Sequence, residues 1–125
     1  VQMRIYPSSR FVTDGQGSLL EARIELLDDM GDSVKGSGAV QIELLQEGEA
    51  RQSETHRRLY SWQAEVMTLE QQKQHYDPIT RAYLFRLKMD RAPDPQHHMI
   101  LWVSFTPVQG ERIEARASLD EVLVP

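Results

Sequence analysis

The sequence predicts an all-β protein, an antiparallel β-sandwich of about seven strands with one short helix. Apolar residues recur at every second position in several segments, most clearly in 20–26 and 40–44. This period is typical of a strand with one buried and one wet face, because successive side chains point to opposite faces. Turn residues separate most of these segments, and none has the pattern of a long helix.

The composition is that of one ordinary globular domain, spanning residues 1–125, with 40% hydrophobic and 26% charged residues. The net charge of −5 argues against a nucleic-acid partner, because phosphate binding needs clustered Lys and Arg. The absence of cysteine excludes disulfides, thiolate metal sites and cysteine nucleophiles. No stretch approaches the roughly 20 apolar residues of a transmembrane helix, so no transmembrane segment is expected.

The first half of the chain predicts three strands. Residues 3–6 form the first, at a sheet edge, because Pro7 cannot donate to a central ladder. Residues 8–17 predict a turn-rich link, and 18–27 and 37–46 two alternating strands. Glycine and aspartate dominate the link between these two, as turns require. Residues 47–58 contain almost nothing apolar and predict an exposed loop.

The second half predicts a helix and further strands. Alternation returns over 59–66, and the Thr68 to Gln71 spacing is that of a capping box, so a short helix is expected within 67–76. Strands follow at about 80–89, 99–106 and 112–119. Both faces of 100–105 are apolar, so we expect the segment 59–76 to cover its second face.

The alternation also predicts which side chains form the inner layer of the sandwich. They are Leu20, Ala22, Ile24, Leu26, Val40, Ile42, Leu44, Tyr83, Phe85, Leu87, Trp102, Ile113, Ala115 and Ala117.

Two patterns resemble known families. Residues 24–36 carry Asp28-x-x-Gly31-x-x-Val34 between two strands, which resembles transthyretin-like, carboxypeptidase-regulatory-like and bacterial immunoglobulin-like domains. The later order of Trp62, a short helix, Tyr83, a proline link and two strands is similar to uncharacterised bacterial cell-envelope proteins, often lipoproteins. The resemblance implies a sandwich fold, a location in the periplasm or cell envelope and room for a lipid anchor upstream of Val1. It implies no catalytic residues.

Three aromatic residues near the helix are candidates for a ligand site. Tyr60, Trp62 and Tyr76 offer rings on which a sugar or a partner side chain could stack. The competing interpretation, which we favour, is that they cover apolar core.

An acidic turn is the candidate metal site. Asp28, Asp29 and Asp32, with Asp14 as a further donor, supply hard oxygens suited to calcium. The competing interpretation is that aspartate is a good turn residue, and the spacing is not that of an EF-hand.

Other catalytic patterns are weak. Adjacent His97 and His98 point to opposite faces of an extended chain, so they cannot share a zinc ion there. Gly36-Ser37-Gly38 is too short for a nucleophile elbow and precedes a strand. We therefore expect no enzyme and no cofactor, and favour a structural or protein-binding module whose recognition face lies within 47–78. The alternatives are carbohydrate binding and calcium-dependent binding.

Overall fold

The computed structural model describes residues 1–6, 10–14, 17–47, 56–90 and 98–119. They form two antiparallel β-sheets and one short helix, as predicted for an all-β sandwich. The first sheet has the order β1-β3-β8-β7, with β2 and β4 also paired to β3, and the second has the order β10-β9-β5-β6. The described residues contain ten strands rather than about seven, because three short ones, β2, β4 and β7, join the first sheet.

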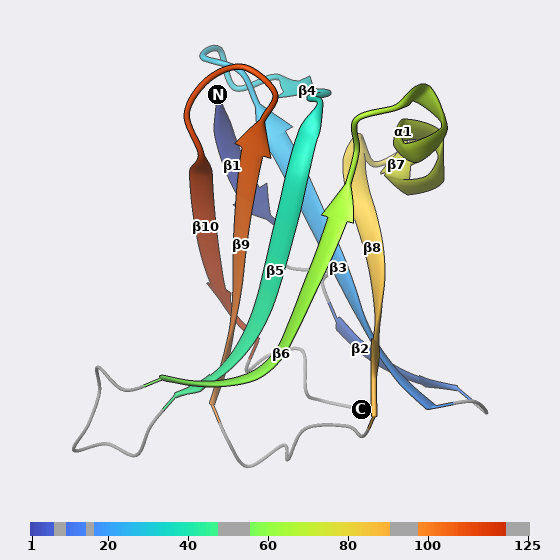
Figure 1. Cartoon of the computed structure of the whole chain (residues 1–125), viewed down its shortest axis with the longest axis vertical. Coiled ribbons are helices and arrows are strands. Elements are labelled where there is room, and N and C mark those ends of the chain that lie inside the picture. The colour runs from blue at the N-terminus through green and yellow to red at the C-terminus, as the bar shows by residue number, and fades with distance from the viewer. Residues whose placement is uncertain (7–9, 15–16, 48–55, 91–97, 120–125) are drawn as a thin grey trace.

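The elements of the first sheet are β1 (Gln2–Ile5), β2 (Arg10–Asp14), β3 (Gly17–Leu27), β4 (Ser33–Val34), β7 (Tyr76–Asp77) and β8 (Ala82–Met89). The second sheet contains β5 (Gly38–Glu47), β6 (His56–Glu65), β9 (Met99–Pro107) and β10 (Ile113–Ser118). The helix α1 (Leu69–His75) lies at one end of the sandwich, which also carries the β3–β4 and β9–β10 connections (Figure 1).

The alternating segments form the core, as predicted. Leu20, Ala22, Ile24 and Leu26 of β3 are at most 3% exposed. They face the alternate residues of β5 in the opposite sheet, of which Leu44 is fully buried. Three predicted core residues of β10 are only partly buried but pack on the same cluster, namely Ile113, Ala115 and Ala117.

One predicted core residue, Trp102, was assigned to the wrong face. Leu101, Val103 and Phe105 of β9 are buried in the core, whereas Trp102 lies outside the core cluster. Because both faces of this strand are apolar, periodicity alone could not choose between them.

The predicted cover for the outer face of β9 was also wrong. Residues 59–65 belong to β6, which lies in the same sheet as β9 and therefore cannot cover it. Trp102 instead lies in the sheet between Glu43 and Arg116, and the Arg112 guanidinium lies 5.3 Å from its ring centre. Charged neighbours within the same sheet therefore surround this ring.

Two predicted loops contain strands. The link predicted at 8–17 contains β2, whose Phe11 and Val12 pair with Leu20 and Leu19 of β3. The turn between β2 and β3 ends at Gly17, whose φ of +138° suits glycine. The loop predicted at 47–58 gives way to β6 at His56, and residues 48–55 of that prediction lie outside the described part.

The structure confirms the predicted capping box at the start of the helix. The Thr68 hydroxyl accepts from the Gln71 N–H, and the Gln71 side chain accepts from the Thr68 N–H. None of its residues is buried, so an apolar face does not hold it in place. Gln72 does so instead, because its Nε2 donates to the main-chain oxygens of Gly36 and Val66. This helix is too short and too polar to cross a membrane.

Candidate functional site

The lateral edges of the two sheets are where this sandwich can engage another chain. A strand at the edge of a sheet leaves half of its main-chain N–H and C=O groups without ladder partners. On one side of the molecule β1 and β10 lie against each other across the two sheets (Figure 1). The opposite side is formed by β6 of the second sheet and β8 of the first.

The edge of β8 is largely closed by side chains. The Tyr6 N–H donates to the Arg23 oxygen, so odd residues of β3 bond to β1 and even residues to β8. Leu84, Arg86 and Lys88 of β8 therefore direct their main-chain groups away from β3. The short strand β7 pairs only with Ala82 and Tyr83, so it leaves these three residues uncovered.

Two side-chain ring nitrogens lie within hydrogen-bonding distance of main-chain oxygens on this edge. His75 Nδ1 lies 3.2 Å from the Leu84 oxygen, and its ring lies 4.7 Å from that of Phe85. The Trp62 indole N–H donates to the Lys88 oxygen at 3.0 Å. A further strand could not pair with β8 without displacing both rings.

The edge of β6 is open. The Val66 N–H donates to the Gly38 oxygen, so the even residues of β6 from Tyr60 onward bond to β5. Ser61, Gln63 and Glu65 consequently direct their N–H and C=O groups outward, and no described residue pairs with them. The register shift lies at the other end of the pairing, between Leu44 and Leu45, so Tyr60 to Glu65 is regular strand.

A groove runs beside this open edge. It is a hollow of about 410 Å³ between β6 and β8, bordered at one end by α1. Its apolar lining comes from Trp62, Ala64, Phe85 and Leu87, and its polar rim from Gln63, Glu65, Gln71, Gln74, Arg86 and Lys88. A hollow of mixed polar and apolar lining beside unpaired main-chain groups can hold an extended segment.

The predicted aromatic residues divide between two places. The rings of Tyr60 and Trp62 stack at 5.5 Å, and both pack against the core from the inner face of β6. Tyr76 instead meets Tyr83 edge-on at 5.1 Å, beneath the ammonium group of Lys35. Trp62 and Tyr76 line different hollows of the surface.

The predicted acidic residues lie in the β3–β4 turn. Asp28 Oδ1 accepts from the main-chain N–H groups of Met30 and Asp32, which is an ordinary turn interaction. No three acidic, histidine or cysteine side chains of the described residues gather in a way that could hold a metal ion. The side chain of Asp14 and the whole of His97 lie outside what the structure describes.

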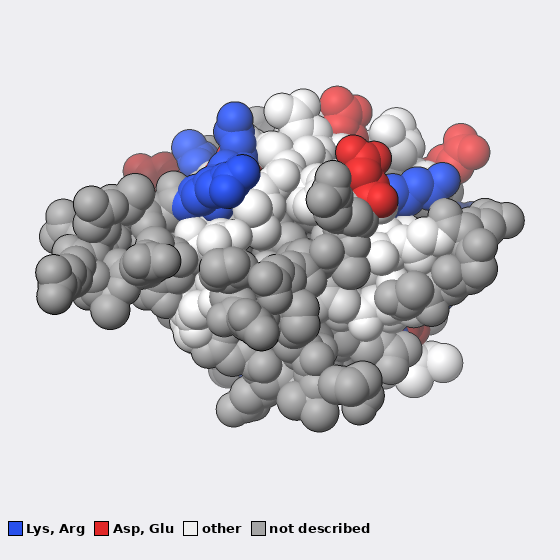
Figure 2. Space-filling model, turned by 90° about the horizontal axis from the view of Figure 1, so that it is seen from below, with Lys and Arg blue, Asp and Glu red and all other residues white. Residues whose placement is uncertain are grey.

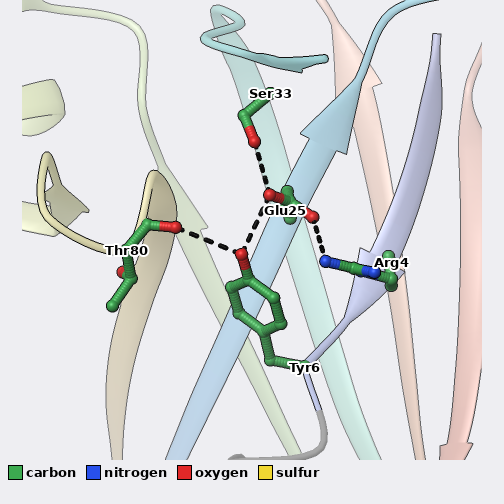
Figure 3. A network of polar contacts seen from close by, with 5 residues as sticks. All are labelled: Arg4, Tyr6, Glu25, Ser33 and Thr80. Carbon is green, nitrogen blue, oxygen red and sulfur yellow. Dashed lines mark hydrogen bonds and ion pairs between the residues drawn. The ribbon is translucent and has the colours of Figure 1, made fainter. Parts of the chain in front are cut away.

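Sequence reasoning missed a polar network on the outer face of the first sheet (Figure 3). Glu25 of β3 is 4% exposed, and one of its oxygens lies 2.6 Å from Arg4 Nη2. The other accepts from the hydroxyls of Ser33 and Tyr6. Tyr6 reaches across β3 to the Thr80 oxygen as well. Glu25 lies at one of the polar positions of the alternating segment, which the sequence pattern assigns to the solvent-facing side of the strand. The pattern therefore could not predict that this side chain is buried.

The network fixes the charge of Glu25. Burial acts to raise its pKa, but the hydrogen bonds from Ser33 and Tyr6 and the charge of Arg4 outweigh it, so the pKa lies below the ordinary value. Burial and the neighbouring carboxylate raise the pKa of Tyr6. Near neutral pH Glu25 is ionised and accepts hydrogen bonds on both of its oxygens. Its role is therefore structural: it ties β1, and through Tyr6 the turn at Thr80, to β3.

The charges at the end opposite α1 are mixed. Figure 2 views that end, and its described surface carries both basic and acidic side chains, with several basic ones gathered on the left of the view. The described residues form an antiparallel β-sandwich in which the edge of β6 is open and the edge of β8 is partly closed by side chains. No protein-family model, curated protein or solved structure matches the chain.

Proposed function

We propose that this chain is a non-enzymatic module that binds a protein partner, and that the partner adds an extended segment to β6. The open edge of Ser61, Gln63 and Glu65 carries this proposal. Its contrast with β8, where His75 and Trp62 occupy edge carbonyls, supports it, because the fold protects one strand and leaves its neighbour available.

We assign the module to a bacterial envelope protein, in the periplasm or cell envelope, with an immunoglobulin-like or transthyretin-like sandwich. The turn from Asp28 to Val34 and the order of elements after Trp62 support this assignment.

Binding at β6 is tested by selecting displayed peptides of about ten residues on the immobilised protein. The decisive variant is Gln63→Pro, which removes an outward N–H that β5 does not use, and Gln63→Ala is its control. Selected peptides should bind the wild type and Gln63→Ala alike and lose at least tenfold in affinity for Gln63→Pro.

Hydrogen exchange locates the bound peptide. Amides of Ser61, Gln63 and Glu65 should exchange more slowly in the complex, because they become ladder donors. Peptides that bind Gln63→Pro as tightly as wild type, or that leave these amides unprotected, would refute binding at this edge.

A further inference from the structure

We infer, building on the proposed function, that the strand added to β6 is β6 of a second copy of this chain. The two strands run antiparallel across a two-fold axis. They join two four-stranded sheets into one sheet of eight strands. Such an interface uses the same patch on both copies, so the patch must complement itself.

The charges of β6 meet this condition. Arg57 and Arg58 stand near the start of the strand, where Arg58 also lies 3.4 Å from the Glu43 carboxylate of β5, and Glu65 stands at its end. Antiparallel copies that pair at Ser61 and Gln63 bring the basic end of each strand to the acidic end of the other. A parallel arrangement would set like charges against each other, which is destabilising.

The middle of β6 suits a two-fold axis, where each residue lies close to its own copy. From Leu59 to Ala64 the strand carries no charged side chain, so no like charges meet there. On the outer face the side chains near the axis are Ser61 and Gln63, which are short or uncharged and can hydrogen-bond across it.

The fold also limits the alternatives. A copy that approached β8 would have to displace the Trp62 indole from the Lys88 oxygen and His75 from the Leu84 oxygen. On the other side, β1 and β10 already lie against each other. Ser61, Gln63 and Glu65 of β6 form a regular run of outward main-chain groups without such protection.

Sedimentation equilibrium from about 5 μM to 1 mM tests the inference. Wild type and Gln63→Ala should form dimers with dissociation constants within threefold of each other. Gln63→Pro should raise the constant at least tenfold while melting as a folded protein. A wild type that stays monomeric to 1 mM would overturn this inference alone, since peptide selection tests the proposed function separately.

Charge exchange tests the orientation. Glu65→Arg makes both ends of β6 basic, and Arg57→Glu introduces an acidic residue at its basic end. Each variant alone should dimerise at least tenfold more weakly than wild type, and an equimolar mixture should form heterodimers in native mass spectrometry. If neither Gln63→Pro nor the charge variants change the dimer dissociation constant, the interface lies elsewhere and the inference is overturned.

Discussion

Trp62 on β6 donates its indole N–H to the main-chain oxygen of Lys88 on β8, 3.0 Å away, and so links the two sheets at their shared side. The bond has two consequences. It satisfies a carbonyl that β8 would otherwise present to solvent or to another strand, and it holds the stacked Tyr60–Trp62 pair against the core. The same side of the sandwich therefore contains a closed edge and an open one.

Replacing Trp62 by Phe should lower the free energy of unfolding by about 1–2 kcal/mol, from the lost hydrogen bond and the smaller ring. It should also increase light scattering on heating, because the β8 edge is partly uncovered. Chemical denaturation and scattering at matched concentrations measure the two effects. Trp102→Phe is the control, since Trp102 lies outside the core, and it should change both less. Equal effects in the two variants would contradict the assigned role of the indole bond.

The Tyr83 hydroxyl joins the helix to the β4–β5 link. It accepts from the Gly36 N–H at 3.1 Å and donates to Gln72 Oε1 at 2.7 Å, while burial raises its pKa. Tyr83→Phe leaves both partners unsatisfied and should destabilise the protein by about 1–3 kcal/mol. Thermal melts measure the loss. Tyr76→Phe removes a hydroxyl from the neighbouring ring and should cost less, so a larger loss there would count against this assignment.

The sequence predicted the fold class because the core obeys a period of two that needs no knowledge of tertiary contacts. It also predicted the helix, since Thr68 and Gln71 cap each other within one turn. It failed at Trp102, where both alternating sets are apolar. It failed too at β2, where a short strand among turn residues forms only because β3 offers it a partner.

The candidate site was only partly predictable. From the sequence we expected a recognition face within 47–78 and singled out Trp62, which lines the groove. It could not show that β6 ends the second sheet, because sheet order depends on which strands pair across the whole chain. Nor could it show that His75 and Trp62 close the edge of β8, since those contacts join residues of different elements.

The acidic β3–β4 turn should not respond to calcium. Asp28 Oδ1 already accepts from two main-chain N–H groups, and Asp29 points into solvent, with its side chain 98% exposed. A ligand that binds only the folded state raises the melting temperature. Because we expect no calcium to bind here, millimolar calcium should leave the melting temperature the same as chelator does.

Variants of Asp28 separate a turn role from a ligand role. Asp28→Asn keeps the acceptor oxygen and should melt near wild type, whereas Asp28→Ala should lose about 1 kcal/mol. A calcium-dependent rise in melting temperature that Asp28→Asn abolishes would reinstate the metal site.

Stability should fall at acidic pH through Glu25. Its folded pKa is lowered, so the unfolded state binds the proton more readily, and the network's full contribution is present above the unfolded value. That contribution is lost as pH falls below the ordinary glutamate pKa, about 4.3, and through the lower folded value. Glu25→Gln should cost about 2 kcal/mol near pH 7 and flatten this part of the profile. Urea denaturation from pH 2 to 7 measures both effects. Glu114→Gln, at a carboxylate whose side chain is 52% exposed beside Arg112, should change stability near pH 7 far less, because an exposed ion pair contributes little. An acid transition of undiminished size in Glu25→Gln would assign the loss to other carboxylates.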